Sequence, residues 1–214
     1  MSEGFRASLF FIEIVKMRLL RIAYFTIASL GFLIMGCRTE DNMAQKASQM
    51  LKDLKENQAK VIISIDGKEF YPDSSVFSGQ MLLTDQMLSL AVTDQFDGKT
   101  MLNFGGDEWY GKSPVSKEVD LKDAFNASLK LGKMVDTKNM IGEGYMMSEG
   151  KIEAVTFELD RMVFSISGKA AKYSDFGTPE KYLPLEGFIV YKMPAISWSN
   201  ITEDEVFSAT KLDK

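Results

Sequence analysis

The residues best suited to chemistry lie in one glycine-rich stretch, residues 105–111, which reads GGDEWYG. Two adjacent carboxylates, Asp107 and Glu108, are followed directly by two aromatic side chains, Trp109 and Tyr110. An exposed indole can stack on a sugar ring while carboxylates accept hydrogen bonds from its hydroxyl groups, so this stretch is a candidate glycan-binding loop. The alternative, and the commoner outcome for such side chains, is a loop at a strand end whose aromatic residues pack on the protein core.

A second aromatic stretch, residues 173–182, lies between two predicted strands and is rich in turn-forming residues. Loops of this length frequently carry function. Tyr173 and Asp175 are therefore candidate ligand contacts. The aromatic side chains of this stretch could equally close one end of a β-sandwich.

The other acidic residues follow no local pattern of a catalytic or metal site. Glycoside hydrolysis needs two carboxyl groups about 5–9.5 Å apart across a cleft, whereas the neighbours Asp107 and Glu108 would point apart on an extended chain. Asp94 and Asp97 could contribute to calcium binding, but the EF-hand pattern is absent. The fourteen methionines are dispersed, which favours core packing over a copper site. We predict no catalytic residue, no metal and no cofactor.

The composition excludes several further classes of activity. The chain of 214 residues contains no histidine and one cysteine, which excludes Ser-His-Asp and Cys-His triads, histidine-ligated metals and intramolecular disulfides. Its 25 basic and 30 acidic residues give a net charge of −5, so electrostatics does not favour nucleic acid as a partner. The apolar content of 45% is typical of a folded domain.

The N-terminal part of the chain has the pattern of a secretory signal peptide. Arg18 and Arg21 precede an uncharged apolar stretch, residues 22–35. As a helix this stretch would be about 21 Å long, which is shorter than the ~30 Å hydrocarbon core of a membrane. We therefore predict a signal peptide over residues 1–36. Acidic residues interrupt the sequence upstream of Met17, which indicates that Met17 is the true initiator.

The single cysteine, Cys37, lies where this signal peptide would be cleaved. Residues 33–37 read LIMGC, which resembles the lipobox of bacterial lipoproteins. Ile34 stands in place of the commoner leucine, and Met35 is bulkier than the usual residue at its position. The resemblance implies that the Cys37 thiol receives diacylglycerol and that more than one acyl chain holds the protein on a membrane. A free cysteine after an ordinary signal peptide is the alternative.

A polar segment and a short helix are predicted between this cysteine and the globular part, over residues 37–59. Arg38 is not aspartate, so the inner-membrane retention signal of enterobacterial lipoproteins is absent. Glu40 and Asp41 resemble the surface-export signals of Bacteroidetes lipoproteins, with a plain solvated linker as the alternative. Apolar residues recur at helical spacing over residues 43–58, which predicts a tether helix, with a helix packed on the globular domain as the alternative.

Residues 60–200 show the alternation of polar and apolar side chains that is typical of β-strands. Alternating runs occur at residues 61–65, 88–92, 101–104, 125–131, 155–159, 162–166 and 188–193. Asp-Gly turn signals at residues 66–67 and 97–98 separate some of them. Eight to ten strands predict a mainly β domain, either an antiparallel β-sandwich or a barrel. A loose tail is expected over residues 201–214.

The chain as a whole resembles the small β-rich lipoproteins of Bacteroidetes envelopes whose function is unassigned. The resemblance rests on the lipobox, the acidic tether, residues 66–68 (DGK) after the opening strand and the closing run 187–192 (GFIVYK). It implies a protein held by lipid at the outer membrane of a bacterial cell envelope, facing the periplasm or the cell surface. We expect a non-catalytic module that binds an envelope protein or another ligand. The alternative is a glycan-binding or glycan-acting surface accessory protein.

Overall fold

The computed structural model describes residues 43–111, 115–120 and 126–208. The predicted signal peptide and Cys37 lie outside this range. Residues 43–53 form a helix, inside the range predicted for the tether. The chain divides into two compact units between Ser48 and Gln49, and the second unit contains every described strand. Within the described ranges, each helix is too short or too polar to span a membrane.

The second unit is mainly β. Its elements in chain order are β1 (Gln58–Ile65), β2 (Lys68–Glu69), β3 (Phe77–Thr84), β4 (Met87–Asp94), β5 (Lys99–Gly105), β6 (Val115–Asp120), β7 (Ala127–Asp136), β8 (Ile141–Glu158), β9 (Arg161–Lys172), the 3-10 helices η2 (Tyr173–Asp175) and η3 (Pro179–Lys181), β10 (Leu183–Lys192), β11 (Ile196–Ser199) and α2 (Glu203–Ser208). Asp66 and Gly67 connect β1 to β2 with positive φ angles of 53° and 71°, as the turn signal predicts.

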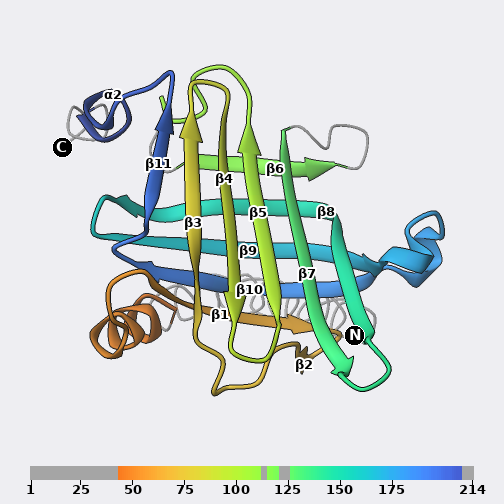
Figure 1. Ribbon diagram of the computed structural model, residues 1–214. Helices are drawn as coiled ribbons and strands as arrows, with labels where there is room; N and C mark the ends of the chain where they lie inside the picture. The colour runs from red at the N-terminus through yellow and green to blue at the C-terminus, as the bar shows by residue number, and fades with distance from the viewer. Residues whose placement is uncertain (1–42, 112–114, 121–125, 209–214) are drawn as a thin grey trace, which may run out of the picture. The chain divides into compact units, whose positions relative to one another are not determined.

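Eight of these strands form a closed antiparallel barrel, in the order β3, β4, β5, β7, β8, β9, β10 and β1. The barrel closes where Ala59 of β1 pairs with Phe77 of β3. In Figure 1 the strands β3, β4, β5 and β7 cross in front of β8, β9, β10 and β1. The prediction of a sandwich or a barrel is therefore narrowed to a closed barrel, an arrangement that removes exposed strand edges.

Three further strands extend this barrel. β2 pairs with the end of β1, and β6 pairs with β8 over residues that β7 does not reach. β11 pairs in parallel with β3, from Ile196 opposite Met81 to Ser199 opposite Thr84. The last strand predicted from the sequence is the run at residues 188–193, so β11 was missed, because a strand of four residues is too short to show an alternating pattern.

The barrel interior is filled by apolar side chains. Alternate residues of β1 and β4 are buried, as the period of two predicts for strands with one face on a core. The rings of Phe104 and Phe164, from β5 and β9, lie with their centroids 6.0 Å apart, and neither residue has exposed surface. An eight-stranded barrel is just wide enough for side chains to fill in this way.

The runs predicted as strands at residues 155–159 and 162–166 pair with each other at the turn of the β8–β9 hairpin, but the register differs from simple alternation. A β-bulge lies between Ala154 and Thr156. Ala154 and Phe157 are consequently both buried, although three positions separate them, and Val155 is 42% exposed. A bulge adds one residue to one strand and shifts the facing of those that follow.

The prediction of a loose tail from residue 201 is wrong for residues 201–208. Glu203–Ser208 form the helix α2, and Thr202 begins it, because the Thr202 N–H and hydroxyl both donate to the Glu205 carboxylate. Ile201 and Val206 are buried in the core of the barrel. Burial of these two side chains orders a segment whose few apolar residues give no periodic signal.

Candidate functional site

The two loops proposed from the sequence lie at opposite ends of the barrel. Residues 105–111 follow β5, whereas the turn at residues 95–98 precedes it. The β7–β8 turn lies at the same end as residues 95–98, because Lys99 at the start of β5 pairs with Gly132 in the second half of β7. Residues 173–182 share that end, since Lys172 pairs with Tyr145 near the start of β8. The structure therefore does not bring the two loops into one site.

Trp109 is a core residue. Its side chain is 3% exposed, and its indole N–H donates to the Thr84 carbonyl at 2.8 Å. Its ring makes edge-to-face contacts with Tyr110 and Phe157, at centroid distances of 5.4 and 5.8 Å. The ring face is thus not available to a sugar, and the structure follows the packing alternative for this loop.

The carboxylates of the same loop, Asp107 and Glu108, are exposed. Glu108 has a positive φ of 48°, and its carbonyl accepts the N–H of Gly111 at 2.8 Å. These contacts belong to a surface turn beside the buried Trp109. They do not form a cleft around the carboxylates of Asp107 and Glu108.

The 173–182 loop is held by its own contacts. The Asp175 carboxylate forms an ion pair with Lys181 at 2.8 Å, and the Tyr182 hydroxyl donates to the Phe176 carbonyl at 2.8 Å. Tyr173 is 53% exposed, and partial burial of its ring raises the pKa of its hydroxyl. Asp175 is therefore already paired, whereas Tyr173 remains open to solution at this end of the barrel.

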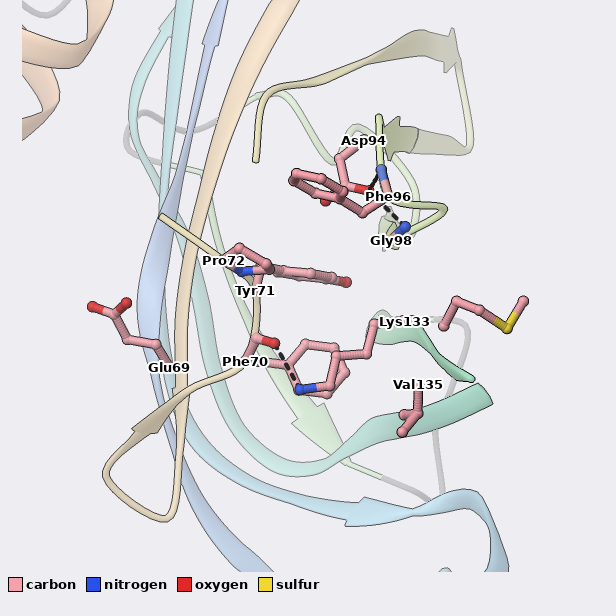
Figure 2. Close-up of a pocket in the computed structure, with 10 residues that line it drawn as sticks. Glu69, Phe70, Tyr71, Pro72, Asp94, Phe96, Gly98, Lys133 and Val135 are labelled. Carbon is pink, nitrogen blue, oxygen red and sulfur yellow. Dashed lines mark hydrogen bonds between the residues drawn. The ribbon is translucent and has the colours of Figure 1, made fainter. Parts of the chain in front are cut away.

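A hollow of about 410 Å³ opens at the same end of the barrel. Three segments line it: residues 69–72, the β4–β5 turn with Asp94, Phe96 and Gly98, and residues 133–135 of β7 (Figure 2). Its volume falls in the range of small-molecule sites. We call it the mouth hollow. No local pattern in the sequence indicates it, because its walls come from three segments that are far apart along the chain.

Asp94 is the most unusual residue of the mouth hollow. Its Oδ1 accepts the N–H groups of Phe96 and Gly98, at 2.9 and 2.6 Å, as Figure 2 shows. The residue is 7% exposed, and among the described residues its Oδ2 has no hydrogen-bond partner. A Cβ on Gly98 would lie 2.8 Å from Oδ1, so only glycine allows the carboxylate this position. Calcium binding with Asp97 gains no support, since the described chain has no cluster of three or more metal ligands.

Tyr71 forms a rigid wall of the mouth hollow. Its hydroxyl donates to the Lys99 carbonyl at 2.7 Å and accepts the Thr100 hydroxyl at 2.9 Å. Burial raises the pKa of this phenol far above its usual value, so the group stays neutral. Its ring packs edge-to-face on Phe70 and Phe77, at centroid distances of 4.7 and 4.9 Å.

Lys133 is the basic residue of the lining, and its charge is already compensated. Its Nζ lies 4.5 Å from the centroid of the Phe70 ring and donates to the Phe70 carbonyl at 2.9 Å (Figure 2). It also lies 3.7 Å from a carboxylate oxygen of Glu143. Lys172 binds the other oxygen of Glu143 at 3.0 Å, and this hydrogen bond is the main reason that the pKa of Glu143 is lowered.

Exposed apolar side chains surround this end of the barrel. The exposed fractions are 49% for Phe96, 62% for Val135, 77% for Met140, 53% for Ile141 and 53% for Tyr173. They come from the β4–β5, β7–β8 and β9–β10 connections and the strand ends beside them. Apolar side chains that gather around a hollow are typical of a binding site.

Comparison with protein-family models, with curated proteins and with solved structures gives no match. The mouth hollow combines apolar and aromatic walls, a compensated cation and a buried carboxylate with one open acceptor. That combination suits binding and orientation of a ligand.

Proposed function

We propose that this protein is a non-catalytic binding protein, anchored by lipid in a bacterial cell envelope, that takes a small and largely apolar ligand in the mouth hollow. The observation that carries the proposal is the hollow itself, with its apolar walls and its apolar rim. Sites of this volume and lining are the usual form of small-molecule binding sites.

Glycan binding is less well supported. That alternative relied on Trp109 as a stacking surface beside Asp107 and Glu108, and Trp109 is buried. Asp175, the carboxylate proposed in the second loop, is paired with Lys181.

Replacing the proposed anchor residue tests the membrane attachment. We expect Cys37→Ser to release the protein from the membrane fraction and to leave the precursor uncleaved, because the thiol is the group that would be acylated. Cell fractionation and the intact mass of the protein measure the two effects. A variant that stays in the membrane with the mass of the mature wild-type protein would show that the anchor is not Cys37.

Filling the mouth hollow tests the binding site. Val135 lines the hollow and is 62% exposed, so Val135→Trp can narrow the opening without disturbing the core. We expect the full chain to bind the neutral fluorescent dye prodan in a saturable manner. The affinity should fall at least about ten-fold in Val135→Trp, as expected when a bulky side chain occupies part of an apolar site.

Val155→Trp is the matched control, because Val155 is also an exposed valine of the barrel and lies outside the hollow. Binding should stay within about two-fold of wild type in this variant. Equal binding by both variants would place the dye elsewhere and remove the mouth hollow as the binding site. Any background from lipid or detergent is the same for the two proteins and cancels in the comparison.

A further inference from the structure

We infer that the ligand of the mouth hollow is an organic ammonium ion with an apolar body, and that its N–H group donates to Oδ2 of Asp94. The inference rests on the proposed function and specifies the ligand class for the same site. It is carried by a buried acceptor without a partner among the described residues, set in the wall of an apolar hollow.

The two carboxylate oxygens of Asp94 differ in their hydrogen bonds. Oδ1 already accepts two backbone N–H groups and organises the β4–β5 turn. An asparagine side chain oxygen could do the same. The turn therefore uses neither the negative charge nor Oδ2. A buried acceptor left without a donor costs free energy, and more when it belongs to a charged group.

Lys133, the basic residue of the lining, is not available to Oδ2, because the Phe70 carbonyl and Glu143 hold its ammonium group. The carboxylate of Glu69, the other acidic residue of the lining, points away from Asp94 (Figure 2). Asp94 is thus left without a cationic partner in the lining, a place that a cationic ligand would fill and an anionic ligand would not.

Aromatic side chains form part of the wall of the hollow. Tyr71 and Phe96 line the hollow together with Asp94. Aromatic rings attract ammonium groups through their negative faces, and the attraction grows when the cation leaves water. A primary ammonium also supplies the N–H that Oδ2 lacks, which a quaternary ammonium cannot do. The site therefore favours a primary or secondary amine on an aromatic or aliphatic body.

Oδ2 is buried, so a ligand can reach it only after a neighbouring side chain moves. The Phe96 side chain belongs to the same turn and is 49% exposed, so it is free to move. Rotation of an exposed side chain between rotamers is fast and inexpensive. We assign to Phe96 the role of a ring that turns aside to admit the ammonium group and then packs on the ligand body.

A matched probe series tests the ligand class. The full chain is titrated by isothermal calorimetry with 4-phenylbutylammonium, with its N-trimethyl derivative, with 4-phenylbutanol and with 4-phenylbutyrate. We expect the primary ammonium to bind about ten-fold more tightly than the alcohol, because it forms a charge-assisted hydrogen bond. The trimethyl derivative should bind more weakly than the primary ammonium, and the carboxylate should not bind measurably.

Two isosteric variants of one turn locate the interaction. Asp94→Asn and Asp97→Asn each remove one negative charge from the β4–β5 turn, and the asparagine introduced by Asp94→Asn would keep an oxygen for the Phe96 and Gly98 N–H groups. We expect Asp94→Asn to lose the preference for the ammonium over the alcohol, a fall of about ten-fold. Asp97→Asn should keep it within about two-fold. Circular dichroism and the thermal midpoint verify that both variants are folded.

A second pair keeps the test valid if Asp94→Asn does not fold. Val135→Lys adds a cation to the lining, and Val135→Gln adds a neutral side chain of similar length. The lysine variant alone should lose the preference for the ammonium. If the alcohol binds as tightly as the ammonium in wild type, or if both charge variants keep the preference, the ammonium inference is overturned. In that case the prodan result with Val135→Trp still decides the proposed function by itself.

Discussion

Replacing Phe164 by alanine is expected to lower the free energy of unfolding by about 3–5 kcal/mol. Phe164 has no exposed surface and packs on Phe104 across the interior of the barrel. The substitution removes buried apolar area and leaves a cavity that a closed barrel has little freedom to fill. Urea unfolding of the full chain, followed by circular dichroism, measures the change from the shift of the midpoint.

Phe96→Ala is the matched control for this experiment, because it makes the same chemical change at an exposed position. Phe96 is 49% exposed in the β4–β5 turn, so the free energy of unfolding should change by no more than about 0.5 kcal/mol. Similar losses in the two variants would contradict the assignment of Phe164 to the barrel core. They would also contradict the alternation from which its burial was predicted.

Replacing Trp109 by alanine is expected to cost a similar amount, about 3–5 kcal/mol. The indole is buried, packs edge-to-face on Phe157, and donates its N–H to the carbonyl of Thr84. Its loss leaves a large cavity and an acceptor without its donor. Chemical unfolding of Trp109→Ala against wild type gives the change in stability.

Fluorescence offers an independent check in a Trp198→Phe background, where Trp109 is the remaining tryptophan. We expect blue-shifted emission and weak quenching by acrylamide, since the indole is 3% exposed. Red-shifted emission with strong quenching, together with an unchanged free energy of unfolding in Trp109→Ala, would place the ring in solution. An exposed Trp109 ring could stack on a sugar, so this result would support the glycan-binding alternative.

The hollow-lining residues changed in the binding tests and Trp109 lie at opposite ends of the barrel. Trp109 packs at the end opposite the mouth hollow, where it contacts Phe157 of β8. Val135, Phe96 and Asp94 line the hollow. We therefore expect Trp109→Ala to act on stability, and substitutions at the mouth to act on ligand affinity.

Local patterns in the sequence were enough to predict the class of the fold and the position of most strands. Alternation of apolar residues is a local property, because successive side chains of a strand point to opposite faces. The runs at 61–65, 88–92 and 101–104 therefore fall within β1, β4 and β5. The Asp-Gly pairs at 66–67 and 97–98 were equally local signals, since a turn with positive φ favours these residues.

Contacts between distant segments determine which of the alternatives holds. Closure into a barrel depends on the pairing of Ala59 with Phe77, and no local pattern encodes a single contact between two strand ends. Burial of Trp109 depends on Phe157, a residue of a distant strand. The mouth hollow depends on three segments that meet only when the barrel closes. Asp94, which lines this hollow, cannot be distinguished in the sequence from any other aspartate before a turn. Local periodicity sets the strands, whereas a site exists only where distant segments bring their side chains together.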